Sequence, residues 1–319
     1  MPALEVIAPG LHTTIQDSGR IGFQDVGVPA SGPLDRISFR LANTLVGNPP
    51  GAPALEMLLQ GPTLKVLANT VRIALVGCSA SIEIRSGNAR RAPAGQSVSL
   101  VRGEVFRVGA LGDSVCAYLA IEGGPDIPPV LGSVSTYVRG RIGGIHGRRL
   151  QAGDLVPLKL DEVELRGERA LARPLDLALE QPIRVMVGPQ ADYFTDEALH
   201  TFLSSEYTVS PQADRMGYRL EGPALAHTKG HDIVSDGIVT GSIQVPGSGR
   251  PIVLMVDHQT TGGYPKIATV ISADIPVVGR RKPGRTIRFV AIEVREAQRL
   301  RREQEAAIAT EISDIRIAE

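Results

Sequence analysis

The sequence contains no tryptophan, and aromatic residues make up only 4% of it. A surface for single-stranded nucleic acid needs aromatic rings on which bases stack, so we expect none here. Basic and acidic residues are equal in number, 34 of each, so no net charge attracts nucleic acid or an anionic membrane. No run approaches the ~18 apolar residues that a membrane span needs, and the N-terminus MPALEVIAPG does not resemble a signal peptide. We therefore expect a cytoplasmic protein without nucleic-acid or membrane partners.

Cysteine is also scarce, and several familiar catalytic motifs are missing. Cys78 and Cys116 both lie in apolar, strand-like runs, which favours buried free thiols in a reducing compartment over a disulfide. The phosphate loop GxxxxGK[ST], a GxGxxG opening a helix and the nucleophile elbow GxSxG are all absent. His227 and His231 are four residues apart, but Lys229-Gly230 between them argues against a helix, and no third ligand is evident. We expect no metal site.

Glycine and proline are plentiful, at 35 and 23 residues, and they punctuate short runs of valine, isoleucine and leucine. This pattern is typical of a mainly β protein with many turns. Apolar periodicity predicts helices over 35–46, with Asp35 as N-cap, and over 192–203, capped by Asp192 or Thr195. The strands are predicted at 4–8, 54–59, 63–67, 71–76, 80–84, 97–101, 104–108, 114–121, 183–187, 206–210, 218–221, 233–234, 238–244, 252–256, 267–271 and 286–293.

The two halves of the chain have a similar outline. In each, a helix precedes a strand that ends in a Gln-or-Glu, Gly, Pro, x, Leu step, and more strands follow. This repeat predicts two related β-barrel units with a few short helices, because 319 residues exceed a single small core. The charged stretch 159–180 contains the expected boundary. We predict units over 1–170 and 171–296, followed by a charged helical tail over 297–319.

One stretch, Asp257 to Val270 (DHQTTGGYPKIATV), is the strongest candidate for a site. It follows the apolar run PIVLMV, which reads as a buried strand, and it begins with five polar residues and a double glycine. Such a loop can bring backbone N–H groups close to a ligand. A hairpin connection with polar decoration is the alternative interpretation.

Four other stretches carry polar residues. The loop-like segment 10–35 contains Asp17 and Arg20, and 235–251 contains Asp236 and Gln244 ahead of the flexible GSG turn. Arg215, in a turn before a strand, can form a fork with a carboxylate or phosphate, or can pair structurally with Asp214 or Glu221. A basic cluster could hold an anion or form a solvated rim, and it consists of Arg139, Arg141, His146, Arg148 and Arg149.

These stretches carry a family resemblance. HTTIQDSGRIGFQDVGVPASGPLDRISFRLANTLVGN, GGPDIPPVLGSVSTY, SPQADRMGYRLEG and SDGIVTGSIQVPGSGRPIVLMVDHQTTGGYPKIATV resemble the allophanate hydrolase subunit 2 family over about residues 4–296. Members are also called KipA or the C subunit of bacterial 5-oxoprolinase, and the carboxyltransferase part of biotin-dependent urea carboxylase is similar. The resemblance implies a doubled, cyclophilin-like β-barrel without prolyl isomerase activity.

The resemblance also implies an activity and partners. It implies the C subunit of an ATP-dependent 5-oxoprolinase, a lactam hydrolase that is inactive without its sister A and B subunits, which would share the ATP. Biotin would be a cofactor only under the alternative of carboxyl transfer to urea or a similar amide, and a KipA-type regulator of a kinase inhibitor is a third possibility. The polar density of 257–266 weighs against a pure regulator.

The expected site residues follow from the matching motifs. Opening a lactam through a phosphorylated or carboxylated species builds negative charge on a small planar ring, so the site needs cations and preorganised N–H donors. We expect Asp257, Lys266 and Asp236 to be catalytic. The expected substrate-binding residues are Asp17, Arg20, Arg215, Gln244, Gln259, Thr260, Thr261, Gly262, Gly263 and Tyr264. We further expect the loop Asp257 to Lys266 and the turn around Arg215 to converge on one groove.

Overall fold

The computed structural model describes residues 1–86, 89–177 and 181–318. Contacts divide these residues into two compact units. The first contains 1–20, 31–177 and 308–318, and the second contains 21–30 and 181–307. Residues 21–30 thus belong to the second unit and residues 308–318 to the first, although each segment is distant in sequence from the rest of its unit. The units expected from the sequence were continuous and did not include these two segments. Positions 178–180 of the expected boundary region lie outside the described residues.

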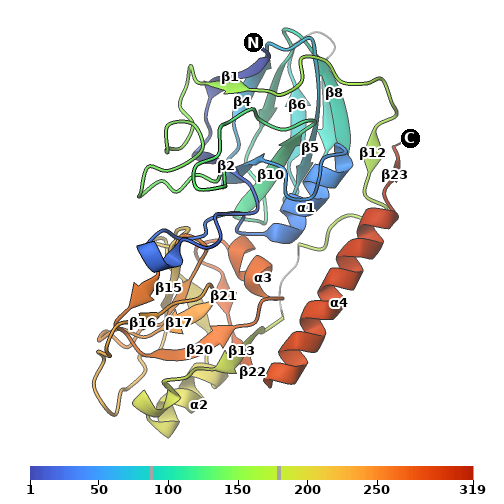
Figure 1. The fold of residues 1–319 in the computed structure, drawn as a ribbon. Helices are drawn as coiled ribbons and strands as arrows, with labels where there is room; N and C mark the ends of the chain where they lie inside the picture. Colours follow the sequence, from blue (N-terminus) through green and yellow to red (C-terminus); the bar gives the residue numbers. More distant parts are fainter. Residues whose placement is uncertain (87–88, 178–180, 319) are drawn as a thin grey trace. The chain divides into compact units, whose positions relative to one another are not determined.

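The first unit contains two antiparallel sheets (Figure 1). The six-stranded sheet has the order β11-β1-β4-β9-β6-β7, with β1 Ala3–Ala8, β4 Thr63–Val66, β6 Ser81–Ile84, β7 Arg90–Pro93, β9 Val105–Val108 and β11 Leu155–Pro157. The five-stranded sheet has the order β2-β3-β10-β5-β8, with β2 His12–Gln16, β3 Ala54–Leu58, β5 Thr70–Val76, β8 Ser97–Val101 and β10 Cys116–Ile121.

Both sheets of the first unit contribute to one hydrophobic core. Leu4, Leu64 and Phe106 of the six-stranded sheet belong to the same buried cluster as Ile73 and Leu119 of the other. Burial alternates along β4 and β9, because one face of each strand packs against the core and the other faces solvent. All six residues of β10 are buried, because the helix α1 packs against this strand.

Helix α1, Arg36–Leu45, begins where the sequence predicts a cap. The Asp35 carboxylate accepts hydrogen bonds from the backbone N–H groups of Ile37 and Ser38, at 2.9 and 3.2 Å. On the buried face of the helix, Phe39 makes an edge-on contact with Tyr118 of β10, with ring centroids 5.7 Å apart. The predicted helix over 35–46 is confirmed to within one residue at each end.

The second unit is organised around one eight-stranded sheet, of order β21-β14-β15-β18-β17-β20-β13-β22. Its edge strands, β21 and β22, are separated in the chain by Arg288 alone, so the sheet is nearly a closed barrel. Near closure leaves few unpaired backbone groups at the edges. The strands are β13 Ile183–Val187, β14 Tyr207–Val209, β15 Gly217–Glu221, β17 Ser242–Gln244, β18 Ile252–Leu254, β20 Lys266–Val270, β21 Thr286–Ile287 and β22 Phe289–Ala291.

Three helices and two short ladders complete the described chain. Helix α2, Asp196–Ser204, is capped by Thr195, and Phe202 stacks on Phe289 of β22 with centroids 4.7 Å apart. Helices α3, Ile275–Arg280, and α4, Val294–Ser313, follow. The ladders pair β12 Arg169–Ala170 with β23 Arg316–Ile317, and β16 Asp236–Gly237 with β19 Thr261–Gly262. Single 3₁₀ turns lie at Gln24–Val26 and Ala191–Tyr193.

The mainly β prediction with a few short helices is confirmed. The predicted strand at 233–234 is wrong, since those residues are irregular, and the predicted strand 238–244 is confined to its last three residues. Helix α3 and strands β2, β7 and β11 were not predicted, because they lie in stretches rich in polar residues or glycine and proline. No helix among the described residues has the length and apolar character that crossing a membrane requires.

Candidate functional site

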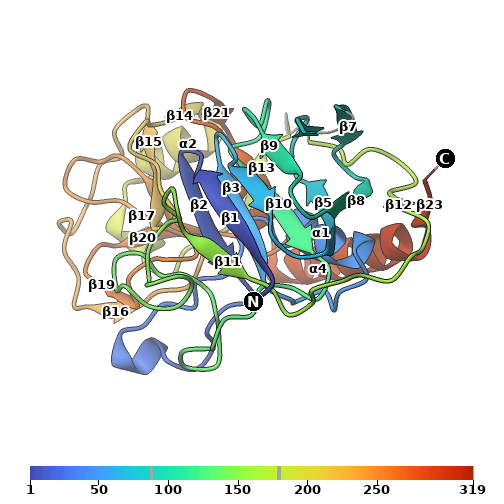
Figure 2. The same cartoon turned by 90° about the horizontal axis from the view of Figure 1, so that it is seen from above.

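The polar loop after β18 does not form a hairpin. Strands β18 and β20, which it connects, are not neighbours, because β17 lies between them and pairs with both. The hairpin interpretation of this stretch is therefore wrong. Within the loop, Thr261–Gly262 forms β19 and pairs with Asp236–Gly237 of β16, and the two short strands lie side by side at the edge of this unit (Figure 2). This ladder brings the 235–251 stretch onto the loop.

Lys266 and Asp236 form an ion pair beside this ladder. Lys266 Nζ lies 2.5 Å from Asp236 Oδ2 and donates a second hydrogen bond to the Gly237 carbonyl, at 3.3 Å. The two partners differ in exposure, since the lysine side chain is 5% exposed and the aspartate side chain 53%. The hydrogen bond from Lys266 is the main cause that lowers the pKa of Asp236 below its usual range, so Asp236 is ionised at neutral pH.

Two glutamines lie next to this pair. Gln259 Nε2 donates to Gln244 Oε1 at 3.2 Å, and Gln244 Nε2 donates to the Tyr264 carbonyl at 3.2 Å. Gln244 and Lys266 face each other in the β17–β20 ladder, so the amides and the ion pair come from adjoining positions. A Cβ atom at Gly262 would lie 2.5 Å from Gln244 Nε2, so a side chain there would displace this amide. Gln259, Thr261 and Tyr264 are exposed and Thr260 is half-buried, so ligands can reach this side of the loop.

Arg215 and Asp257 form a buried ion pair. Arg215 Nε and Nη2 contact the two carboxylate oxygens of Asp257 at 2.8 and 3.1 Å, and both side chains are about 5% exposed. The Asp257 backbone N–H also donates to the Arg215 carbonyl at 2.9 Å. The carboxylate that pairs with Nε and Nη2 of Arg215 is thus Asp257, and not Asp214 or Glu221, the partners considered from the sequence. Because each side chain engages the other, this pair fixes the loop to the turn.

Sequence reasoning missed two residues of this region. His258 is buried and lies 2.6 Å, through Nδ1, from the Gln259 carbonyl. Burial is the main cause that lowers its pKa, so its imidazole is neutral at pH 7. Gln190, which follows β13, contacts both Lys266 and Asp236. No local pattern in the sequence indicates Gln190, since its partners are 46 and 76 residues away.

Asp17 and Arg20 belong to the first unit. Asp17 accepts hydrogen bonds from the Ser133 and Ser135 hydroxyls at 2.5 and 2.6 Å, and from the backbone N–H groups of Val134 and Gly19. The Arg20 guanidinium is buried and donates to the carbonyls of Val130, Ser133 and Ser135. These contacts give both side chains a role in holding the 130–135 segment.

The basic cluster, the two cysteines and the search for a metal site remain from the sequence analysis. Arg148 of the basic cluster forks onto Asp154 at 2.7 and 2.8 Å, which is a structural pair. Cys78 and Cys116 are buried free thiols, as predicted. Among residues 1–86, 89–177 and 181–318, no group of three or more His, Cys, Asp or Glu side chains could hold a metal ion.

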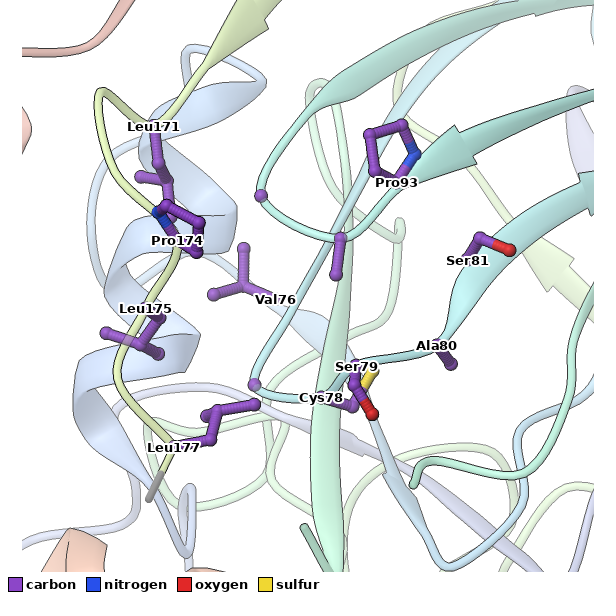
Figure 3. Close-up of a pocket in the computed structure, with 13 residues that line it drawn as sticks. Val76, Cys78, Ser79, Ala80, Ser81, Pro93, Leu171, Pro174, Leu175 and Leu177 are labelled. Carbon is purple, nitrogen blue, oxygen red and sulfur yellow. The ribbon is translucent and has the colours of Figure 1, made fainter. Parts of the chain in front are cut away.

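A cavity of about 280 Å³ lies in the first unit beside Cys78 (Figure 3). One wall consists of Leu171, Pro174, Leu175 and Leu177, and the other includes Val76, Cys78, Ser79 and Pro93. Burial raises the pKa of the Cys78 thiol to about 11, although a hydrogen bond from the Ala80 backbone opposes this. A neutral thiol in an apolar cavity is a poor nucleophile.

Residues 26–291 match the family model described as carboxyltransferase domain, subdomain A and B, and the chain belongs to this family. The resemblance recognised in the sequence motifs is thereby confirmed.

Relatives of two kinds are similar to this chain. It is 38% identical over 309 residues to the C subunit of 5-oxoprolinase from Escherichia coli K12, and the match covers 95% of each protein. It is 37% identical over 334 residues to urea amidolyase of Lachancea kluyveri, over 97% of this chain but only 18% of that protein. The solved structure of K. lactis urea amidolyase superposes with a TM-score of 0.86 at 32% identity, covering 97% of this chain and 20% of that one.

Proposed function

We propose that this chain is the C subunit of an ATP-dependent 5-oxoprolinase, which opens 5-oxo-L-proline to L-glutamate together with the A and B subunits. The observation that carries the proposal is 38% identity to an E. coli protein of that name over 95% of both chains. A second protein of that name, from Haemophilus influenzae, is 35% identical over 95% of both chains.

The Lys266 region supplies groups that suit this chemistry. A lactam is a resonance-stabilised amide, and activating its oxygen or nitrogen develops negative charge on a small ring. In our proposal the Lys266 ammonium and the backbone N–H group of Gly263 stabilise that charge. Asp236, ionised and half-exposed beside Lys266, is the proton acceptor. ATP supplies the activating phosphoryl group and is held largely by the partner subunits.

The other polar residues receive binding or positioning roles. Gln244, Gln259, Thr260, Thr261 and Tyr264 offer amide, hydroxyl and phenol groups that can orient a small polar substrate. Asp257, expected from the sequence to be catalytic, is assigned a positioning role together with Arg215, since both of its oxygens contact that guanidinium.

Carboxyl transfer to urea or a related amide is the second candidate function. The family name and the urea amidolyase relatives favour it. In that protein, however, the matching region is only 18% of a much longer chain, so most of that protein has no counterpart in the match. A KipA-type regulatory role needs no ordered ion pair, and the Lys266 region weighs against it.

The test is reconstitution of the chain with candidate A and B subunits and measurement of ATP hydrolysis that depends on 5-oxoproline, with urea as the second substrate. We expect no turnover by the chain alone. Lys266→Met should lower activity by at least about 100-fold, because a charge-stabilising donor is lost. The solvent-exposed Lys229, which pairs with Asp192, provides the matched control, and Lys229→Met should be neutral. Urea-dependent turnover, or full activity of Lys266→Met, would contradict the proposal.

A further inference from the structure

The geometry points to Gln190 as a further residue of the Lys266 site, a positioning residue whose amide bridges both members of the Lys266–Asp236 pair. This inference deepens the proposed function and rests on it for its effect on activity. Its effect on the ion pair itself can be measured on the chain alone.

One side-chain amide contacts both partners. Gln190 Oε1 accepts a hydrogen bond from the Lys266 backbone N–H at 3.2 Å. Gln190 Nε2 donates to Asp236 Oδ2, the oxygen that also contacts Lys266 Nζ, at 3.4 Å. The three residues come from three different parts of the unit: the turn after β13, strand β16 and the start of β20. Their meeting point is therefore built by the tertiary fold.

The first of these contacts lies at an irregularity of the sheet. In the β17–β20 ladder, Ile243 faces Ala268 but Gln244 faces Lys266, so Ile267 is an extra residue on β20. A bulge of this kind disrupts the ladder and re-aims the neighbouring side chain. At this bulge the Lys266 N–H donates to the Gln190 side chain, which fixes the backbone from which the lysine projects.

Gly188 allows Gln190 to come this close. Its backbone N–H donates to the Ile267 carbonyl at 2.7 Å, and a Cβ atom on Gly188 would lie 2.2 Å from the Lys266 carbonyl. A side chain at position 188 would therefore push the 188–190 segment away from β20. Gly188 permits the close approach of this segment to β20, and Gln190 then accepts the hydrogen bond from the Lys266 N–H.

Glutamine is the side chain whose polarity fits both contacts. Its carbonyl oxygen accepts from a backbone N–H, and its NH₂ group donates to a carboxylate. Glutamate has the same length but would place a second carboxylate against Asp236, and alanine would remove both contacts. Because the Asp236 side chain is 53% exposed, the amide is one of the few contacts that restrict its rotation.

The first arm of the test follows Asp236 in the isolated chain by ¹³C NMR of its carboxyl carbon, in wild type, Gln190→Ala and Gln190→Glu. Lys266 is the charged group that faces Asp236, and the Gly237 N–H and the Gln190 amide are its neutral donors. We expect the pKa of Asp236 to rise in Gln190→Ala and to rise further in Gln190→Glu. Gln212, an exposed residue of the same unit, provides the control, and Gln212→Ala should leave the titration unchanged. An unchanged Asp236 titration in both Gln190 variants would overturn the inference.

The second arm measures activity of the reconstituted complex across pH. We expect Gln190→Ala to lower kcat by about tenfold with little change in melting temperature, and to move the acid limb of the profile upwards with the pKa of Asp236. If Gln190→Ala lowers the melting temperature and leaves the acid limb of the pH profile in place, Gln190 is only structural. If the wild-type complex shows no 5-oxoproline-dependent hydrolysis, the proposed function fails, and the NMR arm still decides the role of Gln190.

Discussion

The Arg215–Asp257 pair allows a quantitative test of what secures the polar loop. We consider two single variants, Asp257→Asn and Arg215→Met, and the double variant Arg215→Met/Asp257→Leu. Each single change removes one of two opposite charges that are both buried, because both side chains are about 5% exposed. Breaking a buried pair in this way costs roughly 3–5 kcal/mol of unfolding free energy. The double change removes both charges and should cost much less than the sum of the single changes.

The assay is thermal unfolding of the purified chain by calorimetry. A loss of that size corresponds to a fall in melting temperature on the order of 10 °C for a domain of this size. The backbone hydrogen bond from Asp257 N–H to the Arg215 carbonyl remains in every variant, so the loop keeps one link to the turn. Arg288→Gln, which breaks an exposed pair with Glu206, is the control and should cost less than about 1 kcal/mol. If the single variants are no less stable than this control, the reasoning is wrong.

Two further predictions concern the first unit. Burial alone would raise the pKa of Asp17, but its four hydrogen bonds lower it below its usual value, so its contribution to stability is present above roughly pH 4 and lost as pH falls through the folded pKa. Asp17→Asn should therefore lower the urea midpoint at pH 7 by more than it does at a pH well below 4, and a deficit that does not change with pH would contradict this. Cys78, whose pKa is raised to about 11, should react with a disulfide reagent at pH 8 only after the chain is unfolded, and labelling of the native protein at the rate of a free thiol would contradict its burial.

The features that could be predicted from the sequence are those whose causes are local. Asp35 and Thr195 cap their helices through backbone N–H groups two or three residues away, so a short window contains the whole interaction. The short apolar runs between glycines and prolines indicated most of the strands for the same reason.

The features that could not be predicted depend on pairing between distant segments. The polar loop was compatible with a hairpin until the position of β17 between β18 and β20 was known. Arg215 had acidic neighbours at 214 and 221, yet its partner is 42 residues away. Nothing in the sequence around Gln190 marks it as a site residue. Its contact with Lys266 arises at the bulge in β20, which the sequence does not indicate.

Asp257 and Asp236 both form ion pairs within the motifs, but one pair stabilises the fold and the other is available for chemistry. The exposure of the two carboxylates distinguishes these roles. The Asp257 carboxylate is 6% exposed and both of its oxygens contact Arg215, so a substrate would have to break a buried pair to use it. Asp236 also pairs with a buried cation, but its side chain is 53% exposed. A substrate can approach Asp236 and, through it, the Lys266 ammonium without unfolding the loop. An ion pair with one buried cation and one accessible carboxylate keeps its charges in place while one of them remains open to a ligand, and for this reason we assign the proposed chemistry to Lys266 and Asp236.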